Sequence, residues 1–265
     1  MLLFLKQHFF YLYFKNTTDM QSLYSNGFEK IYDEMYQTFI DYKEEFTFYS
    51  KILTQHKKNE VLEIGCGSGN LARIFVAHNY KYTGLDYSLE MIHLCKSKNP
   101  ATNFILGDMT NFSLKNKTES ILITGRTSSY LLSNKDISGC LKSIHHNLKP
   151  DGLLCFDFID ANRFFKEIKG GKEVKHTAAF HQKEYERISF FNANTSENLM
   201  FNWDAKYYEI NENQTKLIAE DSSEVRAFSK NEWELFLHLN NFKLIEFIDK
   251  KSYAFDTYVV VAKKI

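Results

Sequence analysis

The chain alternates short apolar runs with longer segments that carry apolar residues at helical spacing. Residues 61–64 form a short β-type run, residues 65–70 are rich in glycine, and residues 71–76 repeat with the spacing of a helix. A short run bounded by turn residues is typical of a buried strand, and apolar residues three and four apart indicate an amphipathic helix. The same alternation predicts further strands at 81–86, 103–109, 120–124 and 153–158, and helices at 88–96 and 134–148.

The two ends of the chain and the segment before the last helix have different patterns. Residues 20–55 predict two helices, and residues 164–226 contain alternating, aromatic-rich stretches that predict an antiparallel β insertion. Ser229, with Glu232 three positions on, predicts the capped start of a helix. Strands at 243–248 and 257–262 then close the fold. We expect one domain, 20–163 with 227–265, that carries the 164–226 insertion as a lid or dimer surface.

Residues 1–19 stand apart from this pattern. They are apolar and aromatic but too short and too interrupted by polar residues to span a bilayer, and they lack the features of a signal peptide. We interpret them as an extension outside the fold, upstream of a natural start at Met20. A segment that lies on a membrane surface is the alternative.

The glycine-rich turn at 65–69 is the first candidate site. A turn between a strand and a helix brings backbone N–H groups and the positive end of a helix dipole to one point. The spacing Gly65-x-Gly67-x-Gly69 differs from the G-x-G-x-x-G of nicotinamide sites. Glu63 precedes the first glycine by two positions, where its carboxylate would repel a pyrophosphate and attract a ligand that carries an ammonium group.

Two further acids follow predicted strands. Asp86 ends the second strand, 17 residues after Gly69, and in a doubly wound fold an acid about 20 residues on binds ribose hydroxyls. The alternative role for Asp86 is to cap the helix at 88–96. Asp108 ends the third strand. Because ligands of open α/β sheets bind outside the carboxyl ends of the strands, Glu63, Asp86 and Asp108 predict one shared site.

The pattern E-x-G-x-G-x-G resembles motif I of the class I S-adenosylmethionine (SAM) methyltransferases, in particular the small-molecule branch of glycine and sugar N-methyltransferases. The resemblance implies an α/β, Rossmann-like seven-stranded sheet whose last strand is antiparallel, with helices on both faces and an antiparallel β lid insertion. It implies SAM as the cofactor and S-adenosylhomocysteine as the product. The implied cofactor-binding residues are Glu63, Gly65, Cys66, Gly67, Gly69, Asp86, Tyr87, Asp108, Met109, Gly125, Tyr32 and Tyr42.

The resemblance also suggests individual roles. Asp108 is expected to accept a hydrogen bond from the adenine amino group, and the backbone N–H of Met109 to meet a ring nitrogen. Tyr87 is expected to pack on the adenine. Tyrosines of the N-terminal helices are expected to fold over the cofactor, because a cation such as a sulfonium is attracted to aromatic rings; ordinary aromatic packing is the alternative for each. These tyrosines are Tyr24, Tyr32 and Tyr42, and Tyr24 is also a candidate for acceptor contact.

Candidates for the methyl-acceptor side are weaker. In related N-methyltransferases a small-residue loop that ends in an aromatic faces the methyl group, which suggests Tyr130 and the unusual Arg126 as catalytic candidates. Arg126 either clamps an acceptor carboxylate or phosphate or pairs with a nearby acid, and an arginine is a poor base. In the insertion, Arg187, Trp203 and Arg226 are candidate lid residues for the acceptor, with structural roles as the alternative.

The composition of the chain excludes several classes of function. The 33 basic and 33 acidic residues give a formal charge of zero, so no basic footprint for nucleic acid is visible. With only Pro100 and Pro150, the chain lacks the (D/N)-P-P-(Y/F) motif of DNA amino-methyltransferases, and it has no Pro-Cys nucleophile. The four cysteines are widely spread without a C-x-x-C pair, which favours buried free thiols in a reducing compartment and predicts a cytoplasmic protein without a metal site.

We therefore predict a SAM-dependent methyltransferase that moves a methyl group to an N or O atom of a small molecule by in-line displacement. It is expected to be a monomer or homodimer without a membrane span. The alternatives are a methyltransferase acting on tRNA or protein, a non-catalytic SAM-binding protein, and, disfavoured by Glu63, a nicotinamide oxidoreductase.

Overall fold

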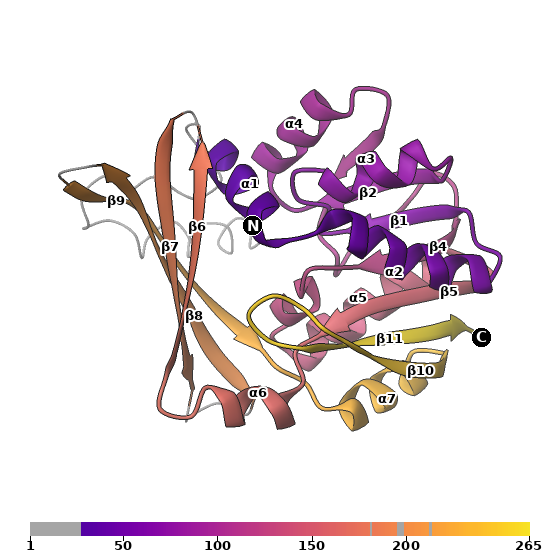
Figure 1. The fold of residues 1–265 in the computed structure, drawn as a ribbon. Helices are drawn as coiled ribbons and strands as arrows, with labels where there is room; N and C mark the ends of the chain where they lie inside the picture. Colours follow the sequence, from indigo (N-terminus) through magenta and orange to yellow (C-terminus); the bar gives the residue numbers. More distant parts are fainter. Residues whose placement is uncertain (1–27, 181, 195–198, 212–213) are drawn as a thin grey trace, which may run out of the picture.

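The structure, a computed structural model, describes residues 28–180, 182–194, 199–211 and 214–265. The segment 1–19 and Tyr24 lie outside the described residues. The chain forms two sheets that stand side by side, a seven-stranded sheet wrapped by helices and a four-stranded antiparallel sheet (Figure 1). This is the expected sheet-and-insertion architecture.

The larger sheet has the order β10-β11-β5-β4-β1-β2-β3. β1 lies at the centre of its parallel part, hydrogen-bonded to β2 on one side and β4 on the other. The last strand, β11, runs antiparallel to both of its neighbours, β5 and β10, which confirms the expected topology. The strands are β1 (Glu60–Ile64), β2 (Lys81–Asp86), β3 (Asn103–Leu106), β4 (Thr118–Ile123), β5 (Leu148–Phe158), β10 (Phe242–Lys250) and β11 (Thr257–Lys264).

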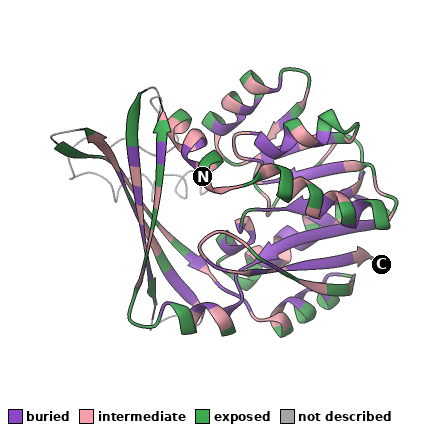
Figure 2. Ribbon diagram, in the orientation of Figure 1, coloured by how far each residue is buried: buried purple, intermediate pink, exposed green. Residues whose placement is uncertain are grey.

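Helices cover both faces of this sheet because its strands are apolar on both sides. Leu62 and Ile64 of β1 face one hydrophobic layer, and Val61 faces the other. Figure 2 shows these central strands buried and the outer helix faces exposed. The helices of the first layer are α5 (Asn134–Asn147) and α7 (Lys230–Leu239); those of the second are α2 (Tyr42–Gln55), α3 (Asn70–Ala77) and α4 (Leu89–Lys98).

The caps follow the expected chemistry. Ser229 accepts a hydrogen bond from the N–H of Glu232, whose side chain returns to Ser229, so the predicted capping box of α7 is confirmed. The four cysteines are buried and free, also as predicted.

The insertion is a four-stranded meander that follows the short helix α6 (Ala161–Glu167). Three of its strands match the predicted alternating stretches, and the first was not identified from the sequence. Its inner end packs on α6 through Phe164, Phe191 and Phe201. The strands are β6 (Lys172–Phe180), β7 (Lys183–Ala193), β8 (Met200–Asn211) and β9 (Gln214–Arg226).

The helix α1 (Phe28–Phe39) joins the two sheets. Met35, fully buried, packs on the insertion residues Ala178 and Tyr207. Asp33, on the same helix, contacts the glycine turn of the larger sheet through Ser68. α1 therefore holds the insertion sheet and the sheet carrying the predicted site next to each other.

Candidate functional site

The glycine turn after β1 has the backbone that only glycine adopts easily. Gly65, Gly67 and Gly69 all have positive φ angles, of 73°, 51° and 75°. A Cβ on Gly65 would lie 2.6 Å from Thr127 Oγ1, whereas a Cβ on Gly67 would meet no atom within 4 Å. The turn is therefore packed against the protein at Gly65 and open at Gly67, as a surface that receives a ligand must be.

Asp86, at the end of β2, faces this turn. Its Oδ2 accepts the N–H of Gly67 at 2.8 Å, and its Oδ1 accepts the N–H of Ser88 at 2.9 Å. Burial raises the pKa of the carboxyl, and the backbone donors partly oppose the rise. The α4 helix is capped by Ser88, which accepts the N–H of Met91, so the alternative role of Asp86 as the helix cap is not what the structure shows.

Glu63 lies beneath the turn with 2% of its surface exposed. Its carboxylate accepts hydrogen bonds from Tyr82 Oη and, at 2.7 Å, from Thr124 Oγ1. Burial raises its pKa to about 7, although both hydroxyl donors favour the charged form. A ligand cation beside Glu63 would stabilise the ionised carboxylate further.

Asp108 and Tyr87 stand at the more open side of the site. Asp108 Oδ1 accepts the backbone N–H of Thr110 at 2.7 Å and its hydroxyl at 2.8 Å, which fixes the carboxylate beyond β3. Tyr87 follows Asp86 and is 80% exposed. Because the ring of Tyr87 is exposed next to Asp86, it is available for stacking on a flat group of a ligand.

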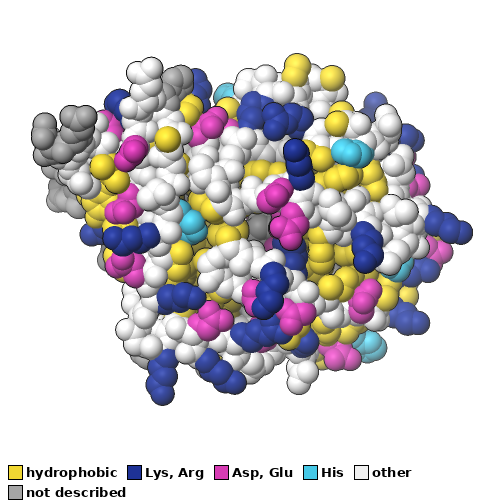
Figure 3. Space-filling model, in the orientation of Figure 1, with side chains coloured by type: hydrophobic (Ala, Val, Ile, Leu, Met, Phe, Trp, Pro, Cys, Tyr) yellow, Lys and Arg dark blue, Asp and Glu magenta, His cyan; other side chains and the backbone are white. Residues whose placement is uncertain are grey.

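These groups open onto one cavity of about 610 Å³ between the ends of the parallel strands and α1. Its size falls in the usual range of small-molecule sites. Figure 3 shows a hollow in the face between the insertion and the larger sheet, with acidic and basic side chains intermixed around it. The predicted residues that line the cavity are Tyr32, Tyr42, Glu63, Gly65, Cys66, Gly67, Asp86, Tyr87, Asp108, Met109, Gly125, Arg126, Tyr130 and Trp203.

Three predicted residues do not line this cavity. Gly69 stands at the N-terminus of α3, and Arg187 is buried in the insertion sheet behind the cavity wall. Arg226 donates to Leu132 O at 3.1 Å and pairs with Glu232 at 3.0 Å. Arg226 therefore has a structural role that joins β9 to the start of α7, in line with the alternative considered for it.

Arg126 lines the cavity, and its side chain pairs with no acid of the described residues. Its Nε and Nη1 are buried without a hydrogen-bond partner in the same part of the chain. The guanidinium sits between the rings of Tyr253 and Phe255, 4.1 and 4.2 Å from their centroids, and donates to Ser252 Oγ at 3.0 Å. The acid nearby, Asp157, accepts the backbone N–H of Arg126 at 2.8 Å. The side chain thus fixes the 252–255 loop at the cavity edge.

Tyr130 lines the cavity and is about half exposed to solvent. Desolvation raises the pKa of its phenol, with the charges of Tyr36 and Asp221 adding to the rise. A phenol that holds its proton more firmly is a poor general base. The ring is therefore better placed to shape the cavity than to remove a proton.

Asp33, a residue behind the glycine turn, was missed by the sequence reasoning, as were Tyr36 and Tyr253, which line the cavity. Asp33 is 5% exposed, and its oxygens accept from Ser68, from Asn70 at 2.8 Å and from Lys98 at 2.7 Å. Lys98 also donates to Asn70 at 2.6 Å. The position of Asp33 directly after Tyr32 was the available signal, and it is a weak one because the same helix also carries Glu29 and Glu34.

The N-terminal tyrosines contribute aromatic faces to the same region. Tyr32 stacks on Tyr36 with ring centroids 4.0 Å apart, and both line the cavity. Tyr42 hydrogen-bonds Asn70, beside the glycine turn, and burial raises its pKa. The helices before β1 therefore line one side of the cavity with aromatic rings.

The described part of the chain contains neither a cluster of metal ligands nor a helix that could span a membrane. Within residues 28–180, 182–194, 199–211 and 214–265, no three His, Cys, Asp or Glu side chains gather as ligands for a metal ion. Across the same ranges, no helix is both long and apolar enough to cross a bilayer.

Comparison with known proteins identifies the class. Residues 61–152 match the family model of a methyltransferase domain. CalS10 from Micromonospora echinaspora, an amino pentose methyltransferase solved with SAM bound, aligns over 93% of this chain and 100% of its own, with a TM-score of 0.71 and 14% identity. The chain has the fold of the class I SAM-dependent methyltransferases, which confirms the resemblance drawn from the sequence, and SAM is the cofactor of that class.

Curated relatives agree with this class. The chain is 26% identical over 135 residues to the putative methyltransferase YqeM of Bacillus subtilis, covering 49% of this chain and 53% of YqeM. It is 24% identical over 141 residues to the dTDP-3-amino-3,6-dideoxy-alpha-D-glucopyranose N,N-dimethyltransferase of Streptomyces fradiae, covering 52% of this chain and 55% of that enzyme. The chain thus spans about half the length of the curated relatives it matches.

Proposed function

We propose that this protein transfers a methyl group from SAM to an N or O atom of a small molecule. The observation that carries the proposal is the convergence of Glu63, Asp86 and Asp108 with the glycine turn on one cavity. The name of the Streptomyces fradiae relative supports an amine-bearing, sugar-like acceptor.

The residues fit the cofactor. The open position at Gly67 leaves room for a close approach to the backbone. Asp86 would hold the ribose hydroxyls, because an ionised carboxylate accepts several hydrogen bonds and its two backbone donors leave lone pairs free. Glu63 would face the ammonium group, and Asp108 with Tyr87 the adenine.

The cofactor supplies the chemistry, since its sulfonium makes the methyl carbon electrophilic. The protein contributes position and exclusion of water. Tyr32, Tyr36 and Tyr130 line the cavity beside the 125–130 loop and restrict where an acceptor can lie. Holding a nucleophile in line with the reacting carbon can supply about 7–11 kcal/mol of the barrier. A neutral amine needs no base, which agrees with the raised pKa of the Tyr130 phenol.

The size and aromatic lining of the cavity favour a small acceptor over a macromolecule. Acidic and basic side chains are intermixed on the face shown in Figure 3, so this face presents no basic surface of the kind that binds RNA. A scaffold that binds SAM without turnover would have the same cofactor end, and only a transfer assay separates the two.

The test is methyl transfer from SAM labelled on the methyl group to a cell extract split by ultrafiltration. We expect label in the small-molecule fraction with the wild-type protein and none with Asp86→Ala. Label in the macromolecular fraction would instead support the tRNA or protein alternative. Tight SAM binding without label in either fraction would support the non-catalytic alternative.

A further inference from the structure

The inner face of the insertion sheet contains a buried cation without an ionic partner. Arg187 is 3% exposed, and its Nε and Nη1 have no hydrogen-bond partner among the described residues. No acid of the described ranges lies within ion-pair distance of its guanidinium. A buried charge is normally paired or held by hydrogen bonds, so an orphaned guanidinium in this position needs an explanation.

Aromatic rings around Arg187 compensate its charge only in part. The guanidinium carbon lies 5.3 Å from the centroid of Tyr36, 5.4 Å from that of Trp203 and 5.6 Å from that of Tyr207. These distances are near the outer limit of about 6 Å for a cation–π contact. Since Tyr36 and Trp203 line the cavity, Arg187 stands directly behind the wall that an acceptor would touch.

Other polar atoms on the same face are also unpartnered. Ser189 Oγ, His176 Nδ1 and Trp203 Nε1 are buried without a hydrogen-bond partner among the described residues. In the register, Arg187 lies opposite His176, and Ser189 lies opposite the small residue Ala205. Arg187, Ser189, His176 and Trp203 therefore lie on one face of the insertion sheet, and each has a buried polar atom without a partner among the described residues.

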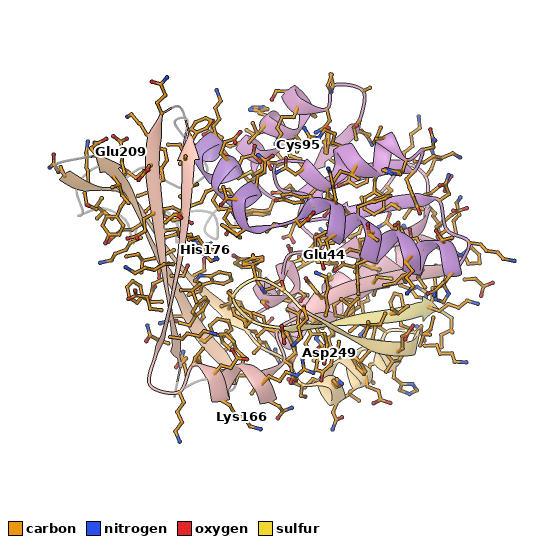
Figure 4. All side chains as sticks on the ribbon, viewed as in Figure 1. Glu44, Cys95, Lys166, His176, Glu209 and Asp249 are labelled. Atoms are coloured by element: carbon orange, nitrogen blue, oxygen red, sulfur yellow. The ribbon has the colours of Figure 1, made fainter. Side chains whose placement is uncertain are left out.

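The ring of His176 is held by aromatic residues of α1 and of the 252–255 loop. His176 packs on Phe39 and Tyr253, with ring centroids 4.1 and 6.1 Å apart, so its ring faces α1 and the 252–255 loop (Figure 4). Burial together with the charges of Arg187 and Arg126 lowers its pKa to about 4. His176 is therefore neutral at pH 7 and able to offer or accept one hydrogen bond.

One acid influences Arg187 from a distance. Asp221 on β9 lies opposite Ala205 in the register, and burial raises its pKa while Arg187 opposes the rise. A single acid beyond ion-pair distance does not use the free donors of the guanidinium. Those donors can be satisfied by an anionic group that enters from the cavity.

We propose that Arg187 forms an anion subsite for the methyl acceptor, so that the acceptor carries a carboxylate or phosphate next to its methylated atom. The unpartnered groups of His176, Ser189 and Trp203 supply the neighbouring hydrogen bonds. This inference rests on the proposed function, because it assigns the acceptor end of the same cavity. It makes Arg187 an acceptor-binding residue that cofactor binding does not need.

The test uses the full chain saturated with S-adenosylhomocysteine and follows tryptophan fluorescence. The chain has two tryptophans, and Trp203 lies at the subsite while Trp233 is buried in the core. The probes are acetate, inorganic phosphate and neutral acetamide, at constant ionic strength held with chloride. We expect a saturable response to acetate or phosphate and none to acetamide, and the stronger of the two anions indicates which group the acceptor carries.

Variants separate the subsite from a general charge effect. Arg187→Gln should weaken anion binding at least tenfold, and Arg187→Lys should weaken it less, while the affinity for S-adenosylhomocysteine stays within twofold. The matched control is Arg163→Gln, which removes the same charge from a surface ion pair with Asp249 and should leave anion binding unchanged.

Three results would overturn the inference. These are no saturable anion response in the wild-type protein, an equal response to acetamide, and competition between the anion and S-adenosylhomocysteine, which would place the anion at the cofactor end. If Arg187→Gln does not fold, the comparison of acetate with acetamide in the wild-type protein still shows whether an anion subsite exists. Failure to bind S-adenosylhomocysteine at all would count against the proposed function instead.

Discussion

The two ends of the cavity differ in how their polar groups are satisfied. At the cofactor end, Asp86 and Glu63 already accept two hydrogen bonds each from the protein. At the acceptor end, Arg187 and its neighbours hold donors that have no partner among the described residues. The end that carries Asp86 and Glu63 is thus preorganised by the chain itself, whereas on the proposed function the other end would be completed by the acceptor.

The difference reflects how each end is built. The cofactor groups lie on the ends of adjacent parallel strands, where register and hydrogen bonding fix their positions. The proposed acceptor groups lie on antiparallel strands, which α1 holds beside the larger sheet by packing against both. Substitutions at the cofactor end should therefore change SAM affinity alone. Substitutions in α1 should change SAM affinity and acceptor binding together.

The largest expected effect is from Asp86→Ala. The substitution removes the acceptor of the Gly67 N–H and the proposed ribose contact, and hydrogen bonds to a charged group contribute about 1.5–3 kcal/mol each. We expect SAM affinity to fall about 100-fold by calorimetry, with the circular dichroism spectrum unchanged. Asp86→Asn keeps one acceptor oxygen, so its SAM affinity should fall less than that of Asp86→Ala. An unchanged affinity in Asp86→Ala would remove the central argument for the cofactor site.

A smaller effect is expected from Asp33→Ala, which cuts the connection between α1 and the glycine turn. Ser68, Asn70 and Lys98 would all lose their shared acceptor. We expect the free energy of unfolding to fall by about 2 kcal/mol and SAM affinity to fall about tenfold. Glu34→Ala on the same helix is the control. A loss of stability without any loss of affinity would show that α1 does not shape the cofactor end.

The pH dependence should come from Glu63. Its folded pKa of about 7 is raised above the ordinary 4.5 by burial, so its contribution to the stability of the ligand-free protein is full below pH 4.5 and is lost as pH rises through 7. An ammonium ligand prefers the ionised form, so SAM affinity should rise about fivefold from pH 6 to pH 8. Glu63→Gln should remove both trends. The same slope in Glu63→Gln would assign the titration to another group.

The smallest effect is expected from Arg226→Gln. Arg226 lies outside the cavity and pairs with Glu232 at the start of α7. Partly exposed ion pairs contribute about 0.2–1 kcal/mol, so we expect a slight fall in melting temperature and unchanged affinity for SAM. A marked rise in the KM for an acceptor would show instead that Arg226 takes part in acceptor binding.

The cofactor end could be predicted because its geometry is local. A strand, a glycine turn and a helix fix their own backbone, and acids at the ends of neighbouring parallel strands must lie together. Asp33 and the role of Arg226 could not be predicted, because both depend on which residue of a distant element packs opposite. The strand β6 was missed because its central part, with Lys175, His176 and Thr177, lacks the strongly apolar alternation of the other three.

The sequence by itself determined the class of fold, the glycine turn and the acids that surround it, because strand ends and turn glycines obey short-range rules. Only the tertiary structure decided that Arg126 donates to the 252–255 loop and Arg226 to the start of α7, whereas Arg187 makes no ion pair with a described residue and lies behind the cavity wall. Nε and Nη1 of Arg126, like those of Arg187, lack a hydrogen-bond partner among the described residues. Identical guanidinium groups acquire different roles because each role depends on the partners that folding brings within hydrogen-bond distance, and those partners are far away in the chain.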